Sequence, residues 1–95
     1  MAAYIVAQID MTDPERYQAY RARVPAAIAK FGGRFIVRAP AVTVLEGEHD
    51  GRRLIVIEFP SMEQLEAFYR SPEYQPLIAI RTGASTGDVW AVPGV

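Results

Sequence analysis

Hydrophobic and polar positions recur along the chain with two periods, one typical of strands and one typical of helices. Five segments show the strand pattern: Ala3 to Met11, Arg34 to Arg38, Val42 to Glu46, Arg52 to Phe59 and Val89 to Val92. In the fourth of these, Leu54 to Ile57 is apolar on both faces, which is typical of a central strand covered on both sides. The breaker Ala39-Pro40 and the turn Gly47 to Gly51 separate the second, third and fourth strands.

A helix is predicted between the first two strands, because apolar residues recur there at spacings of three and four. They are Tyr17, Tyr20, Val24, Ala27, Ile28 and Phe31. Asp13 and Pro14 are suited to the N-cap and the first helical position, and Gly32-Gly33 is suited to the C-terminal end. Pro25 lies inside the run and is expected to kink the helix or split it.

A second helical region is predicted after Phe59. Ser61 and Gln64 form a capping box, and the apolar residues that follow recur at helical spacing. Ser71-Pro72-Glu73 restarts a helical turn that is expected to continue towards Arg81, with Pro76 as an irregularity. Gly83 to Gly87 is expected to form a flexible link to the last strand.

The order of elements predicts an α+β fold of the ferredoxin-like βαββαβ type, formed by a single domain over residues 1–95. Right-handed crossovers place both helices on one face of an antiparallel sheet, with the strands in the order fourth, first, third, second. The opposite face then remains uncovered, although Leu54 to Phe59 is apolar on both sides. We therefore expect two sheets to pair face to face in a homodimer.

Four blocks of sequence resemble a known family. They are Phe31-Gly32-Gly33-Arg34-Phe35-Ile36-Val37-Arg38, Leu45-Glu46-Gly47, Glu58-Phe59-Pro60-Ser61-Met62 and Phe68-Tyr69-Arg70-Ser71-Pro72-Glu73-Tyr74. In these blocks the chain resembles the family called domain of unknown function 1330, within the dimeric α/β-barrel superfamily. The resemblance covers nearly the whole chain and implies a homodimer whose two sheets close into a barrel. It also implies a pocket between sheet and helices in each subunit, but no established activity.

Composition excludes several classes of function. The 95 residues carry ten Lys and Arg against eleven Asp and Glu, which gives no electrostatic reason to expect nucleic acid or an anionic membrane as partner. There is no Cys and only one His, so disulfides, a cysteine nucleophile and a zinc site are not expected, and no cofactor is implied. No apolar run approaches a membrane span and no signal peptide is recognisable, which predicts a soluble, cytoplasmic protein.

Charged residues within the predicted strands are the strongest candidates for a site. By the two-residue period, Arg34, Ile36 and Arg38 share a face, as do Val42, Val44 and Glu46, and Leu54, Val56 and Glu58. Charges flanked by apolar neighbours must be paired or must face a polar cavity. Arg38, Glu46 and Glu58 are therefore expected to converge. The second helical region would add Tyr69, Ser71, Tyr74 and Arg81, and the resemblance points to the same positions.

The sequence allows two interpretations of this cluster. It is either a pocket that binds a small polar or carboxylate-bearing metabolite through an arginine fork, or a buried ion-pair network that fixes strand register and the dimer. The alternative function is a cofactor-independent enzyme, either an isomerase with Glu58 or Glu46 as base or a monooxygenase. The resemblance implies that an oxygenase of this superfamily would rely on asparagine, tryptophan or histidine in the pocket. The chain has no asparagine, one tryptophan in the last strand and one turn histidine, which weakens the monooxygenase alternative. A purely structural dimer is the third possibility. His49 is expected to be a dispensable turn residue without partners, and Tyr17 and Tyr20 are assigned to the core.

Overall fold

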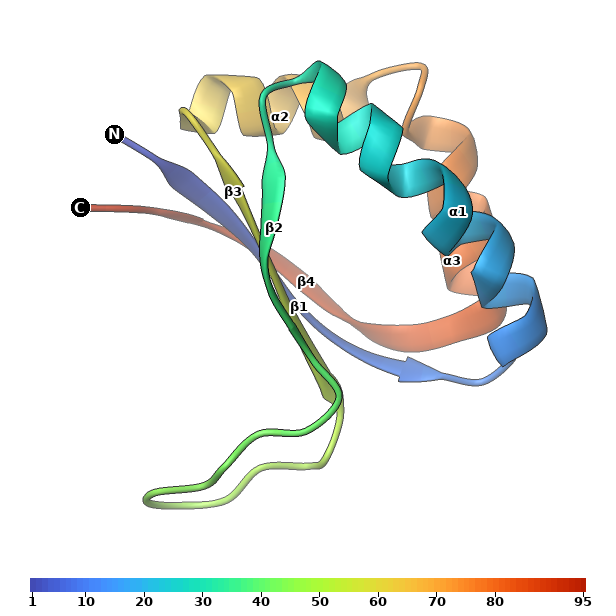
Figure 1. Ribbon diagram of the computed structural model, residues 1–95, viewed down its shortest axis with the longest axis vertical. Helices are drawn as coiled ribbons and strands as arrows, with labels where there is room; N and C mark the ends of the chain where they lie inside the picture. The colour runs from blue at the N-terminus through green and yellow to red at the C-terminus, as the bar shows by residue number, and fades with distance from the viewer.

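The computed structural model describes all residues from 1 to 95 and contains one four-stranded antiparallel sheet and three helices (Figure 1). The elements are β1 (Ala3–Met11), α1 (Pro14–Lys30), β2 (Arg34–Ala39), β3 (Arg53–Phe59), α2 (Met62–Arg70), α3 (Gln75–Ala84) and β4 (Ser85–Pro93). The strand order β2-β3-β1-β4 is the predicted ferredoxin-like order. Strand β3, which is apolar on both faces, lies in the interior of the sheet. No helix combines the length and the apolar composition needed to cross a membrane.

All three helices lie on one side of the sheet, as predicted (Figure 1). The alternate residues Ile5, Ala7 and Ile9 of β1 point towards the helices and are buried, together with Ile57 and Phe59 of β3. The other side carries no helix and is called the open face below. Cross-strand pairing assigns to it Tyr4, Val6, Gln8, Arg34, Val37, Leu54, Val56, Glu58, Asp88, Trp90 and Val92.

Helix α1 begins and ends where its sequence predicts. The Asp13 carboxylate accepts a hydrogen bond from the backbone N–H of Arg16 at 3.1 Å, which satisfies one of the free donors of the first turn. Gly32 follows the helix with a φ of +78°, a left-handed conformation that glycine adopts without steric cost. Pro25 does not split α1, which continues as one helix to Lys30.

Residues 40–52, called the arm below, differ from the prediction. Val42 to Glu46 is not a strand, because β2 is the edge strand of the sheet and no further strand lies beside this segment. The arm instead projects away from the sheet between β2 and β3 (Figure 1). Leu45 in the arm is 90% exposed.

The connection from α3 to β4 also differs from the prediction. Gly83 to Gly87 is not a flexible link, since α3 runs to Ala84 and β4 starts at Ser85. Gly87 is part of β4 and pairs with Ile9; a β carbon at this position would lie only 2.2 Å from the carbonyl oxygen of Gln8. The glycine therefore allows close approach of two strands. Pro76 lies in the first turn of α3, where its missing N–H breaks no helical hydrogen bond.

A β-bulge at Ile36 changes which face the end of β2 presents. Arg34 pairs with Glu58, but after the register shift Arg38 pairs with Ile55. Glu58 and Ile55 are three positions apart in β3 and so lie on opposite faces of the sheet. The prediction that Arg34 and Arg38 share a face is therefore wrong, because one extra residue reverses the alternation.

Candidate functional site

A cavity of about 290 Å³ lies between the sheet and helices α1 and α3. Its walls are mainly apolar side chains of the inner sheet face and of α1: Ile5, Ala7, Ile9, Val24, Pro25, Phe35, Ala39, Ile55, Ile57 and Val89. Small-molecule sites begin at about 300 Å³, so the cavity suits a ligand of one or two rings. Its walls favour an apolar ligand body.

The polar groups of the cavity are all phenols or guanidinium groups. They are Tyr17, Tyr20, Arg21, Arg38, Arg53, Tyr74 and Arg81. None of the 17 lining residues is Asp, Glu or His. The cavity is therefore positively charged at neutral pH and contains no carboxylate to balance that charge.

Arg81 is the buried member of this set. Only 9% of the residue is exposed, its Nε has no hydrogen-bond partner, and no carboxylate forms an ion pair with it. Burial opposes the charge of this guanidinium, but the phenol groups of Tyr74 and Tyr20 beside it outweigh that effect and raise the pKa of Arg81 above its usual value. Arg81 is therefore a buried cation without a carboxylate counter-ion, and a buried charge is costly unless it is paired.

Tyr20 of α1 and Tyr74 at the N-cap of α3 lie beside Arg81 and hydrogen-bond to each other, with 2.9 Å between their hydroxyl oxygens. Burial, and then the neighbouring Tyr74 hydroxyl, raise the pKa of Tyr20 far above its usual value. Burial also raises the pKa of Tyr17. The phenol groups of Tyr20 and Tyr17 are therefore protonated at physiological pH and can donate hydrogen bonds.

Ser71 positions Tyr74 through a hydrogen bond to its backbone. Its hydroxyl donates a hydrogen bond to the carbonyl of Phe68 at 2.7 Å and accepts one from the backbone N–H of Tyr74 at 3.2 Å. The ring of Phe68 also stacks on that of Tyr74, with 4.3 Å between centroids. The turn between α2 and α3 is thereby fixed, and Ser71 acts as a cap instead of lining the cavity.

Three exposed or half-buried arginines lie at the rim of the cavity. The guanidinium of Arg38 lies over the ring of Phe35 at 4.7 Å, and that of Arg21 lies over Tyr17 at 5.6 Å. Arg53 belongs to β3 and is the third. Arg21 also donates a hydrogen bond from Nη2 to the sulfur of Met11 at 3.7 Å. Cation–π contacts hold the guanidinium planes of Arg21 and Arg38 while leaving the other N–H groups available to a ligand.

The structure brings together only some of the residues predicted to form one cluster. Arg38, Tyr74 and Arg81 line the cavity. Glu58 lies on the open face, where its carboxylate accepts hydrogen bonds from Arg34 Nε at 2.9 Å and from the Tyr4 hydroxyl at 3.4 Å. The expected convergence of Arg38 with Glu58 is therefore wrong, because the bulge in β2 separates them to opposite faces.

The remaining predicted residues lie elsewhere. Glu46 is exposed on the arm, so its expected convergence with Arg38 is also not found, because the segment that would have placed it is not a strand. Tyr69 is 37% exposed and lines a separate hollow between α2 and β4, together with Val89 and Ala91.

Sequence reasoning missed four of the lining side chains, Tyr17, Tyr20, Arg21 and Arg53. The two tyrosines are buried, as their assignment to the core predicted, but they also face the cavity. One signal was present in the sequence: Arg21 lies four residues after Tyr17, which places a charge on the apolar stripe of α1.

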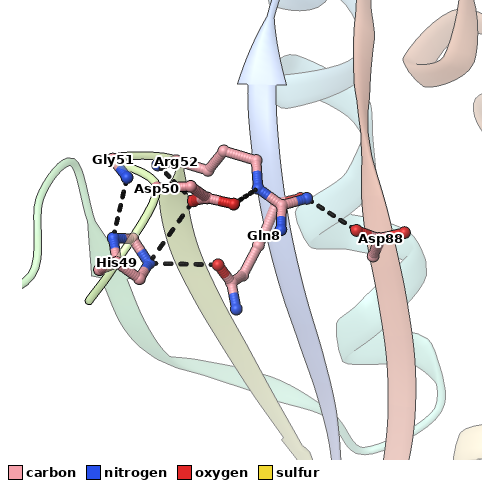
Figure 2. Close-up of polar contacts among 6 residues, drawn as sticks. All are labelled: Gln8, His49, Asp50, Gly51, Arg52 and Asp88. Carbon is pink, nitrogen blue, oxygen red and sulfur yellow. Dashed lines mark hydrogen bonds and ion pairs between the residues drawn. The ribbon is translucent and has the colours of Figure 1, made fainter. Parts of the chain in front are cut away.

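His49 is held by contacts that the sequence did not indicate (Figure 2). Its Nε2 lies 3.1 Å from Gln8 Oε1 on the open face, and its Nδ1 accepts a hydrogen bond from the backbone N–H of Gly51 at 3.0 Å. The expectation of a turn histidine without partners is wrong, because the returning end of the arm lies against β1.

Arg52 continues this contact across the sheet. It forms ion pairs with Asp50 at 2.7 Å and with Asp88 of β4 at 2.8 Å (Figure 2). The backbone N–H and then the guanidinium of Arg52 lower the pKa of Asp50 below its usual value. The returning end of the arm is thus bound to β1 and β4 on the open face, away from the cavity.

A four-stranded antiparallel sheet with helices on one side, in the order β2-β3-β1-β4, is the ferredoxin-like fold. Residues 2–95 match the family described as domain of unknown function (DUF1330), and the chain belongs to that family. The ferredoxin-like fold and the family, both predicted from the sequence, are confirmed. No curated protein matches the chain significantly.

Solved structures show the same fold at low identity. A protein of unknown function from Rhodopseudomonas palustris has a TM-score of 0.77 at 17% identity, over 99% of this chain and 82% of that one. A dimeric ferredoxin-like protein of unknown function from a Jannaschia species has a TM-score of 0.75 at 12% identity, over 99% of this chain and 100% of that one. The cofactor-independent oxygenase SnoaB from Streptomyces nogalater has a TM-score of 0.68 at 16% identity, over 99% and 93% respectively.

Proposed function

We propose that the protein is a homodimer of single-domain chains that binds a small organic anion with an apolar body in the cavity of each subunit. The observation that carries the proposal is the guanidinium of Arg81, which is 9% exposed and has neither an ion-pair partner nor a hydrogen bond at Nε. Buried charges in proteins are normally paired. A ligand oxyanion is the missing partner that this cavity can admit.

The composition of the cavity supports the same conclusion. Four arginines and no acidic residue face it, so an anion gains attraction from every charged group around it. The apolar walls exclude ions that are small and strongly hydrated, since such ions would lose their water without replacement. A carboxylate on a ring or a branched chain meets both conditions.

The homodimer is supported by the open face. Val6, Val56 and Trp90 lie together there without a covering helix, and the neighbouring charges of Glu58 and Asp88 are already paired with arginines. The structurally similar Jannaschia protein is described as dimeric.

The alternative is a cofactor-independent enzyme, which is the description of the structurally similar SnoaB. An acid–base reaction needs a base within hydrogen-bond reach of the substrate. Glu58 and Glu46, the bases considered from the sequence, both lie outside the cavity, whose lining contains phenols and guanidinium groups only. Binding is therefore the better supported function.

Thermal unfolding with benzoate and its neutral analogue benzamide tests the proposal. Benzoate is expected to raise the melting temperature, because at 100 times its Kd a ligand adds about 2.7 kcal/mol to the free energy of unfolding. Benzamide is expected to have little effect. Arg81→Gln is expected to abolish the benzoate effect, whereas Arg23→Gln, an exposed arginine of α1 outside the cavity, is expected to retain it. Equal shifts with both compounds, or none with any carboxylate, would contradict the proposal.

The stability of Arg81→Gln without ligand separates binding from a structural role. Replacement of an unpaired buried cation by a neutral amide removes a desolvation penalty, so the variant is expected to melt no lower than the wild type. A large loss of stability would show that Arg81 supports the fold itself.

A further inference from the structure

The buried end of the cavity, formed by Tyr20, Tyr74 and Arg81, contains hydrogen-bond donors that a ligand can use. In the pair formed by Tyr20 and Tyr74, one hydroxyl donates to the other at 2.9 Å, so the second O–H group remains free to donate. Arg81 also lines this end; its Nε is fully enclosed, so a ligand meets the guanidinium at its terminal N–H groups. This end therefore offers donors to an acceptor atom placed against it.

The number of donors distinguishes two kinds of oxyanion. A carboxylate has two oxygens with about four lone-pair sites to satisfy, and a planar arginine fork suits it best. The oxygen of a phenolate or enolate is one atom that is satisfied by two or three donors. Arg81 attracts either kind of oxyanion, but the free phenol beside it adds one O–H donor, which suits a single ligand oxygen.

We propose that this buried end binds the ionised oxygen of a weakly acidic phenol or enol, and that the cavity thereby lowers the pKa of its own ligand. This inference rests on the proposed function, since it requires the cavity to bind an organic anion. The step is a simple dissociation: the O–H bond of the ligand breaks, its proton leaves to solvent, and the resulting oxyanion accepts hydrogen bonds from the protein.

The charges around the cavity all act in the same direction. The other titratable groups that face it are Tyr17, Arg21, Arg38 and Arg53, none of which is anionic at neutral pH. The phenol of Tyr20 remains protonated, because burial and then Tyr74 raise its pKa. A bound ligand therefore meets cations and neutral donors, and its ionised form binds more tightly than its neutral form.

The experiment uses 4-nitrophenol, whose phenolate absorbs visible light and whose protonation is read directly from the spectrum. With saturating wild-type protein, the pKa of the bound probe is expected to fall by about one unit or more below that of the free probe, which corresponds to about tenfold tighter binding of the anion. The methyl ether 4-nitroanisole has the same body without the acidic group, and its affinity is expected to be at least about tenfold lower than that of the phenolate.

Matched variants assign the effect to the buried end. The double variant Tyr20→Phe/Tyr74→Phe removes both hydroxyls while keeping the rings, and is expected to weaken phenolate binding about 10- to 100-fold, the range for a hydrogen bond to a charged group. Tyr4→Phe makes the same chemical change on the open face and is expected to have no effect on the titration of the probe.

The outcomes separate this inference from the proposed function. If 4-nitrobenzoate binds but 4-nitrophenol does not, or if bound 4-nitrophenol titrates as it does in water, the inference is wrong and the proposed function stands. If neither compound binds, the proposed function itself fails. Retention of the full pKa decrease in the double phenylalanine variant also overturns the inference, because the phenol donors would then be irrelevant.

Discussion

The hydroxyl oxygens of Tyr20 and Tyr74 lie 2.9 Å apart and join helix α1 to the start of α3 beside the buried guanidinium of Arg81. The two residues are 54 positions apart in the chain, and the contact closes the inner end of the cavity. The geometry of this contact therefore depends on the packing of α1 against α3 and on Ser71, which fixes the turn before α3.

Removal of one hydroxyl from this pair is expected to destabilise the protein. Tyr20→Phe leaves the hydroxyl of Tyr74 without its partner in a buried site, which costs about 1–3 kcal/mol. The double phenylalanine variant is expected to lose less than the sum of the two single variants, because it leaves no unpaired group. Urea unfolding of the wild type, both single variants and the double variant gives the coupling energy. Additive effects would show that the hydrogen bond contributes no stability.

The fold was predictable from the sequence because the local patterns and the packing agree. Alternation in β1 and the helical stripe of α1 correspond directly to the faces that become buried. The placement of Arg38 was not predictable in this way. A bulge inserts one residue at Ile36, and the two-residue period contains no sign of it, since the residues before and after are equally compatible with a regular strand.

The bulge predicts which arginine is coupled to Glu58. A double-mutant cycle between Arg34 and Glu58 is expected to give about 0.2–1 kcal/mol, the range for an exposed ion pair. The same cycle between Arg38 and Glu58 is expected to give a value near zero, because the two side chains lie on opposite faces. Arg38→Ala alone is expected to change stability by no more than about 0.5 kcal/mol. Chemical unfolding of the variants measures all of these, and a larger coupling for Arg38 would contradict the observed register.

The arm shows a second limit of sequence patterns. Val42 and Val44 alternate with other residues as in a strand, but a strand requires a neighbour, and the sequence does not show that β2 forms the edge of the sheet. The contact of His49 with Gln8 likewise depends on how the arm folds back, which no local pattern encodes.

His49→Ala is expected to destabilise the protein by about 1 kcal/mol, because it removes the contact with Gln8 and leaves the N–H of Gly51 without its acceptor. Glu48→Ala, at the exposed neighbouring position, is expected to change stability by less than about 0.5 kcal/mol. Urea unfolding of both variants checks this. Equal stability of the two would mean that the arm contributes nothing through His49.

The stability contributed by Glu73 is expected to depend on pH. Hydrogen bonding from Lys30, at the end of α1, is the main cause that lowers the pKa of Glu73 below its ordinary value of 4.5. A carboxyl whose pKa is lower in the folded protein stabilises it above the unfolded value, and this contribution is lost as the pH falls through the folded value. Glu73→Gln is therefore expected to be less stable than the wild type at pH 7, and the difference in stability is expected to shrink as the pH falls. A difference that is independent of pH would show that the ion pair is not its source.

The open face predicts self-association. Trp90 of the edge strand β4 is 44% exposed on this face, beside Val6 of β1, and the monomer has no element that covers it. A face-to-face pair of sheets is expected to bury more than about 1,000 Å² in total, enough for a stable interface. Sedimentation equilibrium at micromolar concentration is therefore expected to give twice the mass of one chain.

A charge on the open face at Trp90 is expected to separate the subunits without unfolding them. Trp90→Glu places a carboxylate where it is solvated in the monomer but buried in the dimer, and an unpaired buried charge is costly. Ala26→Glu makes a comparable change on the exposed side of α1 and is expected to remain dimeric. Circular dichroism of both variants checks that the fold is retained. A wild-type protein that sediments as a monomer, or a Trp90→Glu variant that remains a dimer, would show that the open face is not the interface.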